Sequence, residues 1–364
     1  MSGYIHTGSV SDNGIVNTKD IITDYDLLKV NPPDDGFHLT EPATGNFEWW
    51  YFDVVDIVSD VLCKIVVHLG TNPLRTKYFP QLAVSISTPE SGEYFTEIYK
   101  LSDLDSNTDY CQIQIRNELE IRADYSKGIE YIVNVNLPVF KAELHFRNLI
   151  EGWKPLGNRV RYHISERQAY FMWVIPAPKA SVSGYISLKG SRYNLKLATG
   201  YHDHNYWSVN KSRPLYLDMM VNKWYWGKCY CGDYTIIFMD TLFRKTRLSS
   251  LFVACRDKII HSSNNLVSVR VEKSESDPGL HINFPVSFSV LLDEKDIALN
   301  VSIESVKLIE SKDLLEDVPV LLRWLIRNLV ARPGYFSVQA KARLNINDKV
   351  IEGHGNYEYM VFRT

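Results

Sequence analysis

The chain has 364 residues, of which 45% are hydrophobic and 23% are charged, and this composition supplies enough apolar material for a large folded core. Its length suggests two domains or one large β architecture. The net charge of −3 excludes the strongly basic surface that nucleic-acid-binding domains use, so no nucleic-acid partner is expected.

The sequence contains no signal for export or for membrane insertion. Its first residues, MSGYIHTGSVSDNG, lack a basic region followed by an apolar one, so no signal peptide is expected. A transmembrane helix is not predicted, because no run of about 18 apolar residues is present. The 5 cysteines are few and odd in number, which favours reduced thiols in a cytoplasmic protein.

The segment FEWWYFD (47–53) places acidic side chains among aromatic rings. Successive side chains of a strand point to opposite faces, so Glu48 would share one face with Trp50 and Phe52, and Trp49, Tyr51 and Asp53 would share the other. A carboxylic acid in this position could stay neutral and act as a catalytic acid. Alternatively, Glu48 supplies the hydrogen-bond partner that a buried Trp or Tyr needs.

Alternation of apolar and polar residues with a period of two dominates the chain. In IEYIVNVNL (129–137), the apolar face would carry Ile129, Tyr131, Val133 and Val135. Similar patterns cover 82–87, 112–122, 142–147, 267–272, 298–306 and 336–346. Each pattern predicts a half-buried antiparallel strand. The turn-forming segments 88–93, 123–128 and 188–192 separate such strands at hairpin spacing, which favours an all-β protein built of barrels or sandwiches.

The segment ATGYHDHNYW (198–207) gathers proton-handling groups among aromatic rings. In a strand its two faces would carry different sets: Tyr201, Asp203, Asn205 and Trp207 on one, and His202, His204 and Tyr206 on the other. Desolvation among the rings would favour the neutral form of Asp203 and make it a proton donor near neutral pH. Alternatively, Asp203 accepts backbone or indole N–H bonds and stays ionised as a structural link.

Two pairs of residues have the chemistry of zinc ligands. His202 and His204 share one strand face, as do Cys229 and Cys231, and together they could form a Cys2His2 site. However, any alternating strand generates one-residue spacing, and no zinc-finger framework joins the pairs. We therefore expect buried thiols and hydrogen-bonded histidines, and no stoichiometric metal in the purified protein.

One segment, DVPVLLRWLIRNLVARPG (317–334), predicts a helix. Asp317 is a suitable N-cap, Pro319 suits the first turn, and Pro333 with Gly334 would end the helix. Short apolar helices usually belong to a core. The alternatives are a lid, in which Trp324 contacts the substrate, and a weak membrane-surface contact. If the helix is a lid, serine at Trp324 and Leu325 should weaken ligand binding more than it weakens the fold.

Near the C-terminus, GHGNYEYM (353–360) would place His354, Asn356 and Glu358 on one strand face, and the glycines between them would allow a neighbouring strand or ligand to approach closely. The sequence has no phosphate-binding P-loop, no dinucleotide-binding glycine motif and no G-x-S-x-G elbow. We therefore expect no cofactor, and any chemistry should depend on acids, hydrogen bonds and the shape of a pocket.

Several segments resemble one known family. FEWWYFD, MWVIPAPKASVSGYISL (172–188), GYHDHNYW (200–207), WYWG (224–227) and GNYEY (355–359) are similar to segments of the carotenoid 1,2-hydratase (hydroxyneurosporene synthase) family, whose relatives include AttH-type proteins and fungal decalin-forming Diels–Alderases. The resemblance covers about residues 35 to 362. The chain departs from it where the usual DHNWG is DHNYW, and in the helix 317–334.

The resemblance implies two lipocalin-like β-barrel domains in tandem. We expect an N-terminal extension (1–34) followed by barrels at 35–207 and 208–364. Between the barrels, an apolar pocket with few polar groups would bind a hydrophobic small molecule. The candidate catalytic residues are Asp203, Glu48, His202 and Asn205. The candidate substrate-binding residues are Trp49, Trp50, Tyr51, Tyr201, His204, Trp207, Trp224, Trp226, Glu358 and Trp324.

Three functions fit such a pocket. A cofactor-free cyclase would fold a linear polyene or prenyl chain and reduce the entropic cost of ring closure. A hydratase or acid-initiated cyclase would use Asp203 to protonate an alkene, and aromatic faces would stabilise the cation. A lipocalin-like carrier would bind without turnover. The cyclase is the preferred interpretation, and the identity of genes beside its own would indicate the class of substrate.

Overall fold

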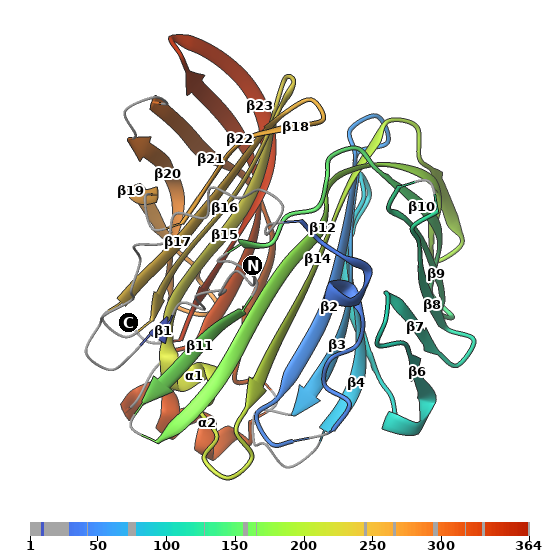
Figure 1. Ribbon diagram of the computed structural model, residues 1–364, viewed down its shortest axis with the longest axis vertical. Helices are drawn as coiled ribbons and strands as arrows, with labels where there is room; N and C mark the ends of the chain where they lie inside the picture. Colours follow the sequence, from blue (N-terminus) through green and yellow to red (C-terminus); the bar gives the residue numbers. More distant parts are fainter. Residues whose placement is uncertain are drawn as a thin grey trace, which may run out of the picture. The chain divides into compact units, whose positions relative to one another are not determined.

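The computed structural model describes twelve ranges of the chain: 9–10, 29–41, 43–71, 78–126, 128–155, 159–164, 166–243, 246–264, 267–293, 298–316, 318–329 and 332–362. It divides into two compact units (Figure 1). Unit 2 contains Asp24–Arg161 and Arg167–Pro214, and unit 1 contains Leu215–Thr364 with the short segments Met1–Thr23 and Tyr162–Glu166. The predicted domain bounds, 1–34, 35–207 and 208–364, stay a prediction.

Unit 2 is built on one antiparallel sheet with the strand order β5-β4-β3-β2-β14-β12-β10-β9-β8-β7-β6, and β13 pairs with β12. The strands are β2 (Phe47–Asp56), β3 (Val61–Thr71), β4 (Tyr78–Ser87), β5 (Gly92–Ile98), β6 (Leu104–Ser106), β7 (Gln112–Ile115), β8 (Leu119–Asp124), β9 (Glu130–Asn136), β10 (Phe140–Asn148), β12 (Arg167–Leu188), β13 (Ser191–Asn194) and β14 (Ala198–Val209). The short strand β1 (Ser9–Val10) pairs with β11 (Arg159–Ile164).

Unit 1 has a second antiparallel sheet with the order β18-β17-β16-β15-β23-β22-β21-β20-β19. Its strands are β15 (Val221–Cys231), β16 (Tyr234–Phe243), β17 (Thr246–Cys255), β18 (Lys258–Asn264), β19 (Val267–Ser276), β20 (Asn283–Asp293), β21 (Ala298–Asp313), β22 (Gly334–Ile346) and β23 (Lys349–Val361). Each sheet curls into a half-barrel (Figure 1). The prediction of two β domains of lipocalin-like type is confirmed.

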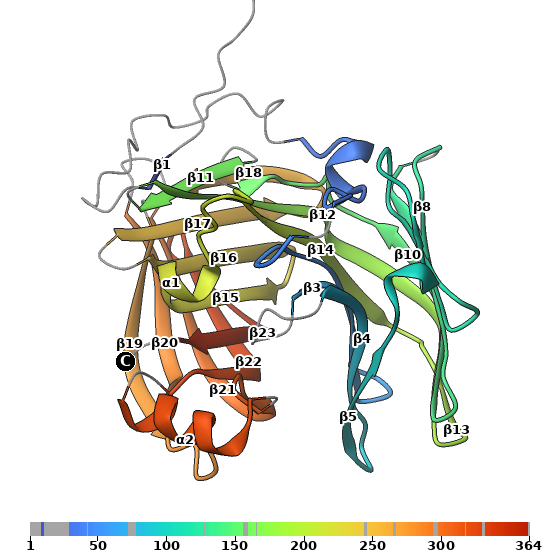
Figure 2. The same cartoon turned by 90° about the horizontal axis from the view of Figure 1, so that it is seen from below.

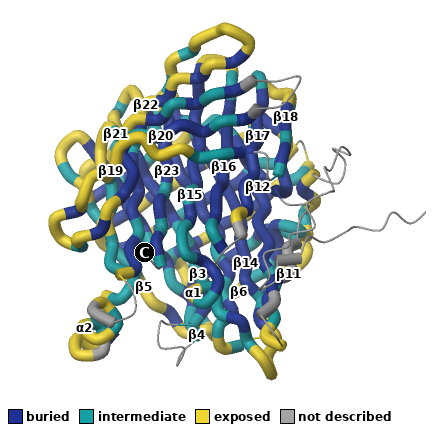
Figure 3. The backbone as a smooth tube through the Cα atoms, turned by 90° about the vertical axis from the view of Figure 1, so that its left-hand side faces the viewer, coloured by how far each residue is buried: buried dark blue, intermediate teal, exposed yellow. Residues whose placement is uncertain are grey.

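The predicted alternation decides which side chains form the two cores. In β9, Tyr131, Val133 and Val135 are buried, as predicted. In β22 the predicted apolar face is buried throughout, from Phe336 to Ile346. Figure 3 shows this burial along the central strands of the sheets.

One strand prediction is wrong. The pattern over 112–122 is two strands in the structure, because the chain turns between β7 and β8 and the two strands pair as a hairpin. Arg116 in this turn has a φ of 50°, a left-handed conformation that interrupts a strand. Alternating side chains on either side of a tight turn give the same sequence pattern as one continuous strand.

Helices are few and short among the described residues. They are the 3-10 helices η2 (Pro32–Asp35) and η3 (Leu101–Asp103) and the α-helices α1 (Leu217–Met220) and α2 (Val320–Leu329). The predicted helix 317–334 is thus shorter at both ends: Pro319 precedes α2, Gly334 begins β22, and the predicted cap Asp317 lies outside the described residues. No described helix has the length and apolar character needed to cross a membrane.

Candidate functional site

The predicted acidic segments lie side by side at the centre of the unit 2 sheet. Strands β2 and β14 pair in antiparallel register, which sets Asp203 opposite Tyr51, Asn205 opposite Trp49 and Tyr201 opposite Asp53. Residues directly opposite each other point to the same face of a sheet. Tyr51, Tyr201, Asp203 and Asn205 therefore share one face, and Trp49 and Trp207 lie on it too.

Asp203 is the centre of a hydrogen-bonded group on this face. Its Oδ2 accepts the Tyr201 hydroxyl at 2.8 Å and the Trp173 indole N–H at 3.1 Å, and its Oδ1 accepts the Asn205 amide at 3.0 Å. Asp203 is only 6% exposed. An ionised carboxylate only accepts hydrogen bonds, so three donors suit the charged form of Asp203. The bond from the Trp173 indole N–H is one that Asp203 would accept as a structural residue. This bond is also compatible with a catalytic role.

Asn205 has an unsatisfied polar atom. Its Nδ2 donates to Asp203, which turns its Oδ1 the other way, and within the described residues this buried oxygen has no hydrogen-bond partner. The side chain is 2% exposed. Leaving a buried acceptor unpaired costs about 1–3 kcal/mol, so such an atom usually has a ligand or water as its partner. Asn205 is therefore placed to accept a hydrogen bond from a bound molecule.

Asp53 and Trp173 also belong to this face, although the sequence analysis did not select them as site residues. Asp53 accepts the Tyr51 hydroxyl at 3.0 Å and is 2% exposed. Tyr51 and Tyr201 contact edge to face, with ring centroids 6.1 Å apart. Strand parity placed Asp53 on the same face as Tyr51. Trp173 lies opposite Asn205 on β12, and no local sequence pattern indicates that pairing.

Aromatic rings extend the face beyond the polar group. Phe47 stacks on Trp49 with centroids 4.9 Å apart and on Trp207 at 6.2 Å. Phe171 contacts Trp207 from β12 at 6.3 Å. Phe47 and Trp49 are half-buried, so this end of the face is partly open. The combination of a few polar groups with aromatic rings is typical of a site for a largely apolar small molecule.

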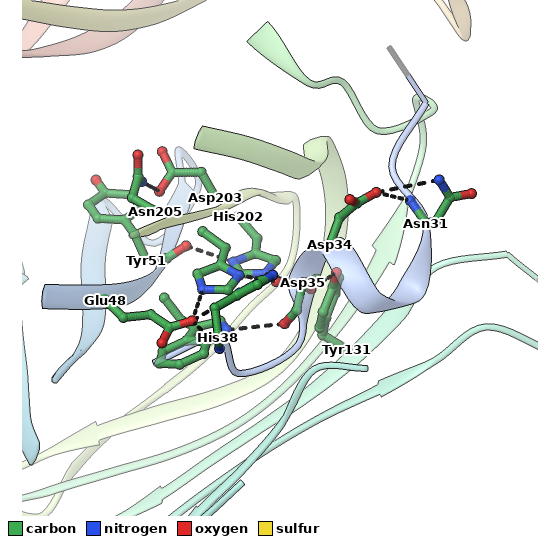
Figure 4. Close-up of polar contacts among 12 residues, drawn as sticks. Asn31, Asp34, Asp35, His38, Glu48, Tyr51, Tyr131, His202, Asp203 and Asn205 are labelled. Atoms are coloured by element: carbon green, nitrogen blue, oxygen red, sulfur yellow. Dashed lines mark hydrogen bonds and ion pairs between the residues drawn. The ribbon is translucent and has the colours of Figure 1, made fainter. Parts of the chain in front are cut away.

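Glu48, His202 and His204 point to the opposite face, so the structure does not bring them together with Asp203 (Figure 4). Glu48 is completely buried and accepts the backbone N–H groups of His38 and Leu39 at 2.9 and 3.0 Å. Its Oε1 also contacts His204 Nε2 at 2.9 Å and His38 Nδ1 at 3.1 Å. Glu48 thus links β14 to the segment that precedes β2.

His202 bonds to Asp35, a residue that the sequence analysis missed. Its Nε2 lies 3.1 and 3.2 Å from the two oxygens of Asp35, and its Nδ1 lies 3.0 Å from the carbonyl oxygen of Tyr51. Tyr131 donates its hydroxyl to Asp35 at 2.6 Å. Asp35 ends η2, which Asp34 anchors by accepting the Asn31 backbone N–H and pairing with Lys154. Figure 4 shows this group.

The charges of this second face stabilise one another. Burial disfavours a charge on His204, yet its contacts with Asp35 and Glu48 outweigh this and raise its pKa to about 9. His204 Nδ1 lies 3.4 Å from Asp35 without hydrogen-bond geometry, so that contact acts mainly through charge. Burial would raise the pKa of Asp35, but the charge of His202 lowers it strongly. Hydrogen bonds from His204 and His38 likewise outweigh burial and lower the pKa of Glu48.

Two groups among the described residues have ligand atoms close enough to hold a metal ion, within 4.8 Å of one another: Asp35 with Cys111 and His202, and His38 with Glu48 and His204. Neither is the Cys2His2 set weighed from the sequence. Cys229 and Cys231 are buried in the core of unit 1, whereas His202 and His204 belong to unit 2. The expected absence of a metal stays a prediction.

Four predicted substrate-binding residues lie in unit 1. Trp224 and Trp226 are buried on β15, and Glu358 lies opposite Trp226 on β23 and accepts the Tyr335 hydroxyl at 2.5 Å. Trp324 is 60% exposed on α2. In unit 2, Trp50 stacks on His204 at 4.4 Å, on the face opposite Asp203. The assignment of all five to substrate binding stays a prediction.

Comparisons with known proteins agree with this fold. Among solved structures, the AttH protein of Nitrosomonas europaea is 13% identical, and the alignment covers 95% of this chain and 98% of that one with a TM-score of 0.62. CghA is 11% identical over 93% and 98%, with a TM-score of 0.59. Kievitone hydratase from Nectria haematococca is 10% identical over 99% of both chains, with a TM-score of 0.54.

The fold is the tandem lipocalin-like fold. The resemblance seen in the sequence is confirmed at the level of the fold, because each alignment covers nearly the full length of this chain and of the matched chain. No protein-family model matches the chain, and no curated protein matches it significantly. At 10–13% identity the likeness is one of fold, and one fold carries many activities, so function has to be argued from the site.

Proposed function

We propose that the chain is a cofactor-independent enzyme that binds a hydrophobic polyene or prenyl substrate and promotes its cyclisation. The observation that carries this proposal is the buried Tyr201–Asp203–Asn205 group, with an unpaired acceptor on Asn205, on an otherwise aromatic face. Two fold neighbours, the Diels–Alderase CghA and kievitone hydratase, add support, since both are enzymes with this architecture.

The polar group would position the substrate. Asp203 holds the amide of Asn205 in one orientation, so Asn205 Oδ1 would accept a hydrogen bond from a substrate O–H or N–H. The rings of Phe47, Trp49 and Trp207 would pack on the apolar chain. Fixing the two reacting ends close together can supply several kcal/mol of the barrier to ring closure, roughly 7–11 in the best intramolecular cases.

The alternative is a hydratase or an acid-initiated cyclase, in which Asp203 protonates an alkene and the nearby rings stabilise the cation. The chain's likeness to kievitone hydratase keeps this reaction as the second candidate. Three hydrogen-bond donors around Asp203 favour its charged form, which makes templated cyclisation the better proposal. A carrier of the lipocalin type would bind the same molecule without turnover.

Product analysis separates cyclisation, hydration and binding without turnover. The assay substrate would be an acyclic polyene or prenyl compound. Its class would be chosen from the biosynthetic enzymes that are encoded beside this gene. Cyclisation gives an isomer of unchanged mass with fewer double bonds, whereas hydration adds one water. Saturable binding with no new product after prolonged incubation would identify a carrier and overturn the proposal.

Two substitutions separate the mechanisms. In templated cyclisation, Asp203→Asn should reduce kcat less than about 100-fold, because the amide keeps the shape and its oxygen still accepts from Tyr201 and Trp173. Trp49→Ala, which removes a packing surface, should then cost more. A loss beyond about 100-fold in Asp203→Asn, together with a mild effect of Trp49→Ala, would favour protonation by Asp203. An active Asp203→Asn enzyme with unchanged rate and product would remove Asp203 from the mechanism.

Asn205→Ala tests the unpaired acceptor. Losing one hydrogen bond to a substrate O–H or N–H should reduce kcat/KM by about 10- to 100-fold, the equivalent of about 1.4–3 kcal/mol. Methylating the substrate O–H or N–H should produce a similar loss in the parent enzyme and little further loss in the variant. Asn134→Ala, on β9, is the control. If methylation of the substrate reduces kcat/KM as much in Asn205→Ala as in the parent enzyme, Asn205 does not bind this substrate group.

A further inference from the structure

Helix α2 exposes four apolar side chains to solvent. Val320 is 79% exposed, Leu321 73%, Trp324 60% and Leu325 37%. At 100° per residue these four positions fall within one arc of the helix, so their side chains form a single apolar patch. Short apolar helices usually bury such a side, and the core interpretation of this helix is therefore wrong for these residues. Figure 2 shows α2 beside β21, and Figure 3 colours several residues of α2 as exposed.

Two arginines of α2 contact the chain that precedes the helix. Arg323 donates to the carbonyl oxygen of Val318 at 3.0 Å and also to that of Glu316. Arg327 pairs with Asp313 at the end of β21. Both arginines thus tie the helix to the end of β21 and to the segment before α2, and at 100° per residue Arg327 lies beside the apolar patch, about 20° from Val320.

The charge of α2 indicates what the patch contacts. Its sequence, VLLRWLIRNL, contains two arginines and no acidic residue, and Arg332 is exposed just after it. The Arg327 side chain stays 41% exposed despite its ion pair. Aliphatic residues and tryptophan on one side, with basic residues at the edge, are the features of helices that lie in the interface of an anionic membrane.

We propose that α2 docks on the surface of a lipid bilayer that contains anionic headgroups. Val320, Leu321, Trp324 and Leu325 enter the boundary between headgroups and acyl chains, and Arg327 meets the headgroup phosphates. A second copy of the chain is a poorer occupant, because a symmetric contact would bring the same basic edges together. A hydrophobic polyene partitions into bilayers, so the contact would bring the chain to its substrate; this last link alone rests on the proposed function.

Vesicle co-sedimentation of the full chain tests the proposal. The wild type should bind vesicles of phosphatidylcholine mixed with phosphatidylglycerol more strongly than vesicles of phosphatidylcholine alone, and added salt should weaken the difference. The double variant Leu321→Ser/Trp324→Ser should lose at least about tenfold in partitioning. The matched control is Ile98→Ser/Leu197→Ser, which replaces side chains of similar exposure, 63% and 66%, in unit 2. It should bind as the wild type does.

Thermal unfolding separates docking from folding, because exposed side chains contribute little to stability and the double variant should keep the wild-type melting temperature. Three outcomes would overturn the proposal. The wild type fails to sediment with either vesicle, or the double variant binds as strongly as the wild type. The third is a wild-type dimer that becomes monomeric in the variant and binds no vesicles, which would identify the patch as an interface between copies.

Discussion

The two faces of β14 carry polar residues of different character. On one face, His202 and His204 each contact a carboxylate at about hydrogen-bond distance, and the group is enclosed. On the other face, Asp203 is satisfied but Asn205 keeps an unpaired acceptor among the described residues. Each face contains one unpaired buried atom, but His204 Nδ1 lies 3.4 Å from the Asp35 carboxylate and interacts with its charge, whereas Asn205 Oδ1 has no partner among the described residues. The contrast favours the Asp203 face as the site.

A glycine on β23 permits the close approach that the segment 353–360 predicted. A Cβ added at Gly355 would lie 2.2 Å from the backbone oxygen of Lys228 and 2.9 Å from the sulfur of Cys229. Because the first neighbour is backbone, it cannot turn aside as a flexible side chain would. Gly355→Ala should therefore destabilise the protein by about 1–3 kcal/mol, the usual cost of overpacking.

Thermal unfolding measures this effect as a melting temperature several degrees below that of the wild type. Gly92→Ala on β5 is the matched control, since nothing lies within 4 Å of the Cβ it adds, and it should be near neutral. Equal melting temperatures for the two variants would show that β15 and β23 can separate without cost.

At the scale of elements, β12 explains how a proline-rich segment enters the centre of a sheet. Proline lacks a backbone donor and is tolerated in a central strand only at a bulge. The register of β12 against β14 shifts between Val174 and Ala177 and again between Ala177 and Ala180, where Pro176 and Pro178 lie. The two register shifts accommodate the prolines, so β12 continues from Arg167 to Leu188 as one strand. Trp173 lies before the first shift and still pairs with Asn205.

Strands were predictable from the sequence because alternation is local. The faces of Asp203 and of Glu48 followed from parity alone, and the structure confirms that these residues point in opposite directions. Their partners were not predictable. Asp35 is 167 residues from His202 and 96 from Tyr131, and no local pattern connects such positions. The network on the second face is therefore a product of the fold, which brings η2 over the sheet.

For helix α2, too, the sequence predicted the element but not its contacts. Its existence followed from its composition and the flanking prolines, but a lone helix has no sequence signal for which side faces the protein. The contacts of Arg323 and Arg327 with Val318 and Asp313 decide the orientation. The lid interpretation, with Trp324 and Leu325 contacting a substrate, stays a prediction beside the membrane contact.

For the whole molecule, the buried charges of unit 2 link stability to pH. Glu48 and Asp35 have lowered pKa values, so their contribution to stability is present above their ordinary titration range and is lost on acidification. His204 has a raised pKa, so its contribution is complete below about 6.5, the ordinary histidine value. Stability from this network should therefore be greatest between about pH 4.5 and 6.5.

Raising the pH through the folded pKa of His204, about 9, should weaken the fold. Between pH 6.5 and 9 the folded state holds a proton on His204 that the unfolded state has released, so the free energy of unfolding should fall by at most about 1.4 kcal/mol per pH unit. Urea unfolding at a series of pH values measures this slope. His204→Gln should be less stable at pH 6 and should lose the slope, whereas His145→Gln, at an exposed pair with Glu130, should keep it. A wild-type curve that stays level from pH 6.5 to 9 would mean that His204 is neutral in the folded protein.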